Sequence, residues 1–487
     1  MPEIKNTFLA GKMNKSLDDR IIPQGEYRDA LNVQVTKAEG SDVGVIHNIE
    51  GNEIAHTSLS LGAGYETIGS FFDEKDNRIF WFVTNNSNNY IYSWSVGDST
   101  ATAIVQGSFL NFNKSNRITG VNLLEDLLFW TDNRNQPRRI DVTRANGSYY
   151  DSEIKVSVAK YAPYLAPSVT AVENDPLVKS KRIEKEFIRF AYRYKFVNNE
   201  YSLLSPFTPI VFEMENNIID TSSNYYNTSD LKELGASTEM PLMVNNINKV
   251  TMNIPLPTGT TGAKEDYEIE SIDILYKESD SVAIRIIETI DVGSAENSGI
   301  KQYVYKSSNF KSTLPEDQLT RVYDAVPLKS LTQEVAGNRV VYGNITLKKD
   351  LPDIDFAVSY DNKVTTNAAV SQQSVKQRRT YEVGIVLSDI FGRTSPVITS
   401  DSSTIYVGAK DKGFDNTNYS GNSLNIIFKT INDPNGTLYN ASTNPTGWYS
   451  YKVVIKQKSK NIITYIIQVL FTMEVHTKAT LQYTLIT

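Results

Sequence analysis

Two aromatic strand segments at a fixed spacing constrain the fold of this chain most strongly. Residues 77–84 (NRIFWFVT) and 125–142 (EDLLFWTDNRNQPRRIDV) each combine an apolar run, an aromatic pair and a polar turn. Their tryptophans, Trp81 and Trp130, lie 49 residues apart. A repeat of about 40 to 50 residues with this signature is typical of β-propeller blades, because a four-stranded blade needs about that much chain. The sequence therefore predicts an all-β fold that contains part of a propeller.

The composition and charge limit the kind of protein that this chain can be. It has 487 residues, of which 40% are hydrophobic and 22% charged, as in an ordinary globular protein with several domains. The net charge of −7 argues against a general nucleic-acid wrapper. It still allows a channel that passes DNA and adheres to it weakly. The chain has no cysteine, which excludes disulfides and thiolate chemistry.

Two further regions share a strand pattern that predicts an internal duplication. Residues 187–197 alternate large apolar and basic side chains and lead through a turn to a Ser-Pro pair, and residues 381–396 repeat this design. The pairs, Ser205-Pro206 and Ser395-Pro396, lie 190 residues apart. Further strand-like segments follow each pair, at 250–256 and 272–277 and at 424–429 and 451–456. Short alternating strands separated by Pro, Gly and Asn are typical of immunoglobulin-like or fibronectin III-like β-sandwiches.

The segment 331–344 (LTQEVAGNRVVYGN) echoes the first blade through Asn338, Arg339 and Tyr342. We therefore expect a propeller that resumes after a sandwich was inserted into it, since insertions succeed at exposed loops between rigid strands. The predicted division is an N-terminal arm with a few strands (1–52), propeller blades (53–150), a first sandwich (151–320), returning propeller strands (321–360), a second, incomplete sandwich (361–457) and a tail (458–487).

The tail does not share the pattern of the rest of the chain. Residues 458–487 lack period-2 alternation and contain no Gly, Pro or Asp. One hypothesis is a frameshift near residue 458 that truncated a longer protein and left the second sandwich without its last strands. We then expect the tail to pack outside the sandwich pattern.

Residues that support catalysis or metal binding are scarce. The chain has three histidines, His47, His56 and His476, and none has a partner at a metal-site spacing. No nucleotide-binding or nucleophile-elbow motif occurs. Acidic runs at 73–77 and 265–270 are more typical of hairpin tips than of calcium or glycosidase sites. We expect no enzyme activity, no cofactor and no metal ion, and no apolar run is long enough to predict a membrane segment.

Two other functional classes stay open at this stage. Trp81 and Trp130 would suit a sugar-stacking surface, although matching blade positions favour a place in the core. A carbohydrate-binding, adhesin-like protein would combine propeller and fibronectin-like modules, but the N-terminus does not resemble a secretory signal. A propeller glycosidase would need two inward carboxylates about 5 to 9.5 Å apart, which the sequence does not locate.

Several short motifs together resemble a family of tailed-phage virion proteins. They are residues 8–14 (FLAGKMN), 23–33 (PQGEYRDALNV), 128–141 with Asp132 and Pro137, and 322–327 (VYDAVP) with 338–344 (NRVVYGN). The chain is similar to nozzle, or tail tubular B, components and to the muzzle proteins of crAss-like phages. The structural motif residues are Trp81, Trp130, Asp132, Pro137, Ser205, Pro206, Asn338, Arg339, Tyr342, Ser395 and Pro396.

This resemblance implies a structural role in the virion. Such proteins form a homo-oligomeric ring in a short tail, made in the bacterial host cytoplasm, whose bore conducts and gates DNA during ejection. The implied partners are other copies of the chain, other tail or portal-complex proteins, and DNA that passes without sequence-specific binding. Ring contacts of this kind are heterologous, so that one patch of each subunit meets a different patch on its neighbour.

Overall fold

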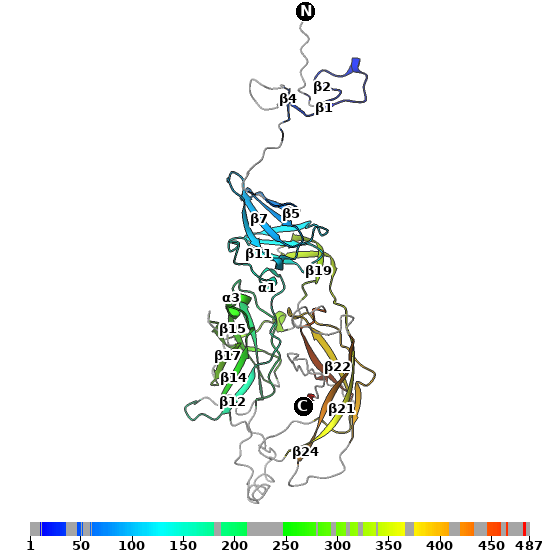
Figure 1. The fold of residues 1–487 in the computed structure, drawn as a ribbon. Coiled ribbons are helices and arrows are strands. Elements are labelled where there is room, and N and C mark those ends of the chain that lie inside the picture. The colour runs from blue at the N-terminus through cyan, green and yellow to red at the C-terminus, as the bar shows by residue number, and fades with distance from the viewer. Residues whose placement is uncertain are drawn as a thin grey trace, which may run out of the picture. The chain divides into compact units, whose positions relative to one another are not determined.

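The computed structural model shows a protein built almost entirely from small, mostly antiparallel sheets (Figure 1). The prediction of an all-β fold is confirmed. The chain divides into two compact units, Met1–Gly62 with Trp94–Ala101, and Ala63–Ser93 with Thr102–Thr487. The structure describes residues 10, 12–35, 46–49, 51, 59, 61–179, 187–211, 247–278, 281–293, 299–307, 312–319, 325–337, 339–365, 375–408, 419–432, 446–458, 464–465 and 481–483.

The described part of the N-terminal arm, between residues 10 and 51, has short strands and no buried side chain among those assigned an exposure. Strands β1 (Lys12–Met13) and β2 (Glu26–Tyr27) pair in parallel, and β3 (Val33–Val35) pairs with β4 (Ile46–Asn48). A 3₁₀ turn, η1 (Asp19–Ile21), lies between β1 and β2. Without a buried apolar core, hydrogen bonds and ion pairs contribute most of the contacts of this region.

Two sheets form what we call the two-sheet module. The first has the order β5-β6-β7-β8 and the second the order β11-β10-β9. Phe80, Phe82, Leu128 and Trp130 lie in one shared core. The segments predicted from the two tryptophans are strands β6 and β10. The bounds are β5 (Glu66–Asp73), β6 (Arg78–Thr84), β7 (Asn89–Ser95), β8 (Thr102–Gln106), η2 (Ser108–Leu110), β9 (Gly120–Leu124), β10 (Leu127–Thr131) and β11 (Arg138–Asp141).

A hairpin from much later in the chain lies against this module. Strands β19 (Lys329–Ala336) and β20 (Arg339–Thr346) pair with each other, and Gln333 of β19 donates to Asn122 of β9 at 3.1 Å. The amide of Asn133 also donates to the carbonyl of Ser330 at 3.0 Å. None of the sheets formed by the described strands closes on itself. The propeller assignment therefore stays a prediction.

The first sandwich consists of a three-stranded sheet, β12-β14-β17, and a four-stranded sheet, β13-β15-β16-β18. Alternate residues of β13, β14 and β15 form its core, as period-2 alternation predicts. Its elements are α1 (Glu153–Val156), which precedes it, β12 (Ser168–Glu173), β13 (Ile188–Phe196), β14 (Lys249–Pro255), α3 (Ala263–Tyr267), β15 (Ile269–Glu278), β16 (Arg285–Asp291), β17 (Ile300–Tyr305), β18 (Ser312–Thr313) and α4 (Glu316–Leu319).

The second sandwich repeats this arrangement with the sheets β21-β24-β27 and β23-β22-β25-β26. Its core again comes from alternate residues of the central strands, including Phe356, Ile385, Ile426 and Val453. The strands are β21 (Asp353–Thr365), β22 (Arg379–Ser388), β23 (Thr404–Val407), β24 (Tyr419–Asn432), β25 (Ser450–Lys458), β26 (Thr464–Tyr465) and β27 (Leu481–Tyr483). The finer assignment to an immunoglobulin or fibronectin topology stays a prediction.

The described strands of the tail, Thr464–Tyr465 and Leu481–Tyr483, differ from the expectation that the tail lies outside the sandwich. Strand β26 pairs with β25, and β27 pairs with β24. These are the sheet positions that β16 and β17 occupy in the first sandwich. A free strand edge offers unpaired backbone groups to any extended segment, so pairing does not need an alternating sequence.

Candidate functional site: polar junctions between the β modules

A tight turn after β10 carries the first junction residue. Asp132 is buried, and its Oδ1 accepts the backbone N–H groups of Arg134 at 3.0 Å and Asn135 at 2.7 Å. Pro137 then leads the chain into β11. This arrangement holds the side chain of Gln136 in a buried position. Asp132 and Pro137, which the sequence singled out, thus shape the turn that presents Gln136.

Arg393 joins the second sandwich to this turn. Its Nη2 donates to Oε1 of Gln136 at 2.6 Å, and its Nε donates to the carbonyl of Val326 at 2.7 Å. Its Nη1 donates to Oδ2 of Asp389 at 3.0 Å. Both charged side chains are almost fully buried. Removing one partner of such a pair costs about 3–5 kcal/mol, because the other charge stays buried without compensation.

Lys349 extends this junction from the segment before β21. Its Nζ lies 3.5 Å from the carboxylate of Asp389 and donates to the carbonyl of Gly447 at 2.6 Å. Burial lowers the pKa of Lys349, and Asp389 opposes part of that shift. Asp389 therefore interacts with two cations from two different segments.

The first sandwich is joined to the two-sheet module by a second ion pair. Arg139 of β11 binds Glu200 through both guanidinium nitrogens, with the first contact at 2.7 Å. Burial acts to raise the pKa of Glu200, but the hydrogen bonds from Arg139 outweigh it and hold that pKa below its usual value. A two-point contact of this kind fixes orientation as well as distance.

Glu268 supplies a third contact to the same junction. Its carboxylate accepts hydrogen bonds from the hydroxyl of Tyr149 at 2.9 Å and from Nζ of Lys160 at 3.0 Å. Burial, together with Glu268, raises the pKa of Tyr149 to about 12. The phenol therefore keeps its proton at neutral pH and acts as a donor in this contact.

Sequence reasoning missed these junction residues. Arg139 and Glu200 are 61 residues apart, and Arg393 and Gln136 are 257 residues apart. In a sequence, a single charge beside a turn looks the same whether it is solvated or buried. A weak signal existed in Asp389-Ile-Phe-Gly-Arg393, where a carboxylate and a guanidinium flank a glycine that has a positive φ of 81°.

The two Ser-Pro pairs occupy matching positions. Oγ of Ser205 accepts the N–H of Tyr192 at 2.9 Å, and the Ser205 amide donates to the Tyr192 carbonyl at 2.8 Å. Ser395 makes the same two contacts with Leu387, at 2.9 Å and 2.8 Å. Each hydroxyl also donates to the carbonyl of the following proline. In both sandwiches a serine thus makes the hydrogen bonds to β13 or β22 that a neighbouring strand would otherwise make.

The two tryptophans lie in different environments. Trp130 is fully buried in the core of the two-sheet module. Trp81 is half-buried and stacks on Tyr92 with ring centroids 5.5 Å apart, while Tyr92 stacks on Tyr90 at 5.6 Å. Tyr92 therefore covers one face of Trp81, and this stack gives Trp81 a packing role within its sheet.

The hairpin residues that the sequence singled out lie at its outer strand. Arg339 is exposed at the start of β20, and Tyr342 is half-buried opposite Gln333. Asn338 lies outside the described residues. The structure brings neither hairpin residue to the junctions or to the Ser-Pro pairs.

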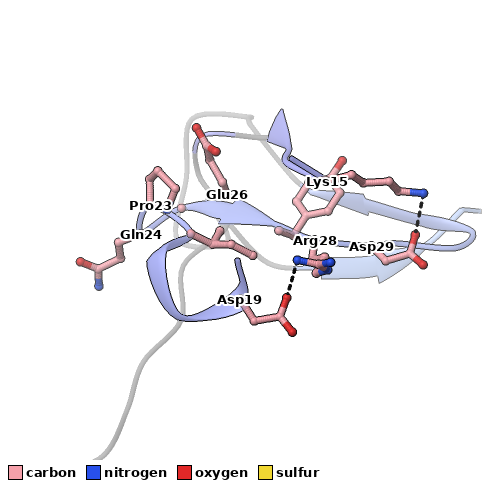
Figure 2. A pocket seen from close by; sticks show the side chains of 10 residues that line it. Lys15, Asp19, Pro23, Gln24, Glu26, Arg28 and Asp29 are labelled. Atoms are coloured by element: carbon pink, nitrogen blue, oxygen red, sulfur yellow. Dashed lines mark ion pairs between the residues drawn. The ribbon is translucent and has the colours of Figure 1, made fainter. Parts of the chain in front are cut away.

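The arm contains a hollow of about 840 Å³ lined by Lys15, Asp19 and residues 22–29. Figure 2 shows its charged side chains in two ion pairs, Arg28 with Asp19 at 2.8 Å and Lys15 with Asp29 at 3.7 Å. Exposed pairs of this kind contribute little to stability. The hollow thus offers paired surface ions rather than a catalytic arrangement.

Within the described ranges, no group of three or more His, Cys, Asp or Glu side chains is placed to hold a metal ion. His47 lies in β4, while His56 and His476 fall outside the described residues. The acidic run at 73–77 contains Asp73 paired with Arg78 at 3.1 Å. In the run at 265–270, Asp266 accepts hydrogen bonds from Thr261 and Gly262. Among the described helices, none is long and apolar enough to cross a membrane.

Comparison with known families identifies the relatives of this chain. The sequence model of the family described as Crassvirus muzzle protein matches residues 3–472. The chain belongs to the Crassvirus muzzle protein family. The resemblance inferred from the short motifs is confirmed, and membership of this family makes the chain a phage structural protein. The family is consistent with a protein that is not an enzyme. The truncation stays a prediction.

Other comparisons add little to membership of the muzzle family. No curated protein matches the chain. One solved structure, the extracellular domain of a one-component system from B. thetaiotaomicron, aligns with 9% identity and a TM-score of 0.14. The alignment covers 74% of this chain and 48% of that one, so the chain spans about half of its length. A likeness this weak carries no argument about the muzzle-family chain.

Proposed function

We propose that this chain is a ring-forming subunit of the phage tail, in the nozzle, and that the ring conducts and gates DNA during ejection. The observation that carries the proposal is the match to the muzzle family over residues 3–472. The ring would consist of copies of the chain and would contact other tail or portal-complex proteins.

The polar junctions suit such a role. Arg393 with Gln136, Arg139 with Glu200, and Tyr149 with Glu268 tie β modules together through buried or half-buried contacts. A ring that resists internal pressure needs subunits whose modules do not shift relative to one another. The net charge of −7 is also compatible with a bore to which DNA adheres weakly.

The experiment is to locate the protein in purified virions. Immunogold labelling with antibodies against the chain should decorate the tail and spare the capsid surface. The purified full chain should form closed rings in negative-stain images. If the protein is absent from virions, or if the antibodies label only the capsid, the proposal is wrong.

The adhesin-like and glycosidase alternatives gain no specific support. Trp81 is stacked on Tyr92 rather than presented to solvent with both faces free. In the 73–77 and 265–270 runs, Asp73 and Asp266 make local contacts with Arg78 and Thr261. Neither arrangement favours sugar binding or glycosidic bond cleavage over a structural role.

A further inference from the structure

Most strand edges of the two-sheet module and its hairpin make at least one hydrogen bond or bridge to another segment of the chain. The carbonyl of Ile104 on β8 accepts the amide of Gly147 at 2.8 Å. On the edge of β11, Arg138 forms a bridge with Ser157. The β9 edge faces β19, where Gln333 reaches Asn122. Exposed strand edges template association with other chains, so covering them keeps a subunit from pairing at random.

Two edges are the exceptions among the described residues. Strand β20 pairs only with β19, and the second half of β5, Ser70–Asp73, pairs only with β6. The first half of β5 is covered, because the Ile68 carbonyl accepts the amide of Ile118 at 2.9 Å. The register of the β19–β20 hairpin shows no shift, and β20 (RVVYGNIT) contains no proline. Asn344 departs from the extended backbone with a φ of 51°, so the regular part of this edge is Arg339–Gly343.

Both open edges carry exposed apolar side chains. On β20, Val341 is 53% exposed and Ile345 is 44% exposed, and Leu347 just beyond is 56% exposed. Val341 and Ile345 share one face of the strand because they are four residues apart. On β5, Phe72 is 48% exposed. Exposed apolar side chains on an unpaired edge indicate a contact surface rather than a solvated one.

The charges at the two edges are opposite. Arg339 and Lys348 are exposed at the ends of β20, and no ion pair links either to another described residue. Glu74 and Lys75 are both exposed directly after β5, and the turn as a whole is acidic, with Asp73, Glu74 and Asp76 against Lys75 and Arg78. An antiparallel contact between two β20 strands, centred between Gly343 and Asn344, would place Arg339 of each copy opposite Lys348 of the other. Like charges at that distance oppose self-pairing, whereas the β5 edge complements them.

We infer that the β20 edge of one copy binds the Ser70–Asp73 edge of β5 in a second copy. Backbone hydrogen bonds would extend the sheet across the contact, Val341 and Ile345 would pack near Phe72, and Arg339 and Lys348 would face Glu74. The two edges are different surfaces of one chain, so the contact is heterologous and propagates from copy to copy. This inference rests on the proposed ring and names the surfaces that build it.

Cysteine cross-linking tests the contact directly, because the chain contains no native cysteine. The variants Phe72→Cys and Val341→Cys are purified separately as full chains, mixed in equal amounts and oxidised. We expect a covalent dimer from the mixture and none from either variant alone. A dimer from Val341→Cys alone would indicate paired β20 strands and overturn the inference.

A charge exchange provides a second, independent readout. Arg339→Glu should weaken self-association by about tenfold, and adding Glu74→Arg in the same chain should restore it. Glu125→Arg, in the turn after the covered β9, is the matched control and should have no effect. If Arg339→Glu forms rings normally, and the mixture of Phe72→Cys and Val341→Cys gives no covalent dimer, the inference is overturned. The proposed function would still stand, because rings form. A wild-type chain that stays monomeric would overturn the inference, and virion labelling would then judge the proposed function separately.

Discussion

The two sandwiches have cores built from matching strands, but the outer faces of their four-stranded sheets differ. When the Ser-Pro contacts are matched, Leu387 of β22 takes the place of Tyr192 in β13. The next residue is Arg193 in the first sandwich and Ser388 in the second, and their cross-strand partners are Asp273 and Ser450. A buried ion pair in one copy therefore corresponds to two serines in the other.

The surroundings of these positions explain the difference. In the first sandwich Arg193 donates to Asp273 at 2.9 Å and to Gln318 of α4 at 2.6 Å. Leu314, beside α4, packs with Leu275 in a small cluster on the same outer face. At the position of Leu275 the second sandwich has Lys452, opposite Val386 as Leu275 is opposite Ala191. Sandwiches with the same core construction thus have different outer faces. In the first, the segment with Leu314 and α4 covers this face, whereas the second has the polar side chains of Lys452 and Ser388 there.

Breaking the buried ion pair should give the largest effect. We expect Arg193→Met to lower the free energy of unfolding of the first sandwich by about 3–5 kcal/mol, because Asp273 stays buried without its partner. Hydrogen exchange of peptides that cover β13 and β15 measures this locally. Arg193→Met combined with Asp273→Leu should recover most of the loss, since both charges are then gone. A single variant with unchanged exchange would show that the pair is not buried in solution.

The two serines of the Ser-Pro pairs should have equal effects if the sandwiches are duplicates. We expect Ser205→Ala and Ser395→Ala each to cost about 1–3 kcal/mol, because each leaves a buried backbone N–H without an acceptor. The N–H groups concerned belong to Tyr192 and Leu387. Hydrogen exchange at β13 and β22 gives the two values, with Ser87→Ala as an exposed control. A large loss in one sandwich and none in the other would contradict the matched roles.

Lys452 should make the stability of the second sandwich depend on pH, whereas Leu275, at the matching position, has no titratable group. Burial lowers the pKa of Lys452 to about 8, from a usual value of 10.5. Below pH 8 the amine is charged in both states, so the folded state carries the full cost of holding a charge in this half-buried position. Between pH 8 and 10.5 the folded state loses the proton before the unfolded state does, so stability rises with pH.

Replacing this lysine sharpens the comparison. We expect Lys452→Leu to stabilise the second sandwich at pH 7 by an amount on the order of 1–2 kcal/mol and to remove its gain in stability above pH 8. Thermal unfolding followed from pH 7 to 10 measures both effects. Leu275→Met in the first sandwich is a control that should leave the pH profile unchanged. A pH profile for Lys452→Leu that matches the wild type would contradict the burial of this amine.

The sequence was informative where structure depends on local periodicity. Alternation located β13 and the start of β22 within about two residues, because every second side chain of a half-buried strand must be apolar. It also matched Ser205 with Ser395, since each follows a long alternating strand. The junctions could not be predicted in this way. Arg139 meets Glu200, and Arg393 meets Gln136, only after distant strands pack, and no local pattern marks a charge that becomes buried.

The smallest expected effect belongs to the serines that replace the ion pair. Ser388 and Ser450 are buried, and among the described residues their hydroxyl groups have no hydrogen-bond partner. Removing an unpaired buried hydroxyl removes a desolvation cost and leaves only a small void. We therefore expect Ser388→Ala and Ser450→Ala each to raise the free energy of unfolding by less than about 1 kcal/mol. Hydrogen exchange across β22 and β25 measures the change. A loss as large as that expected for Arg193→Met would show that these hydroxyls hold a partner, and the outer faces of the two sandwiches would then be equally polar in design.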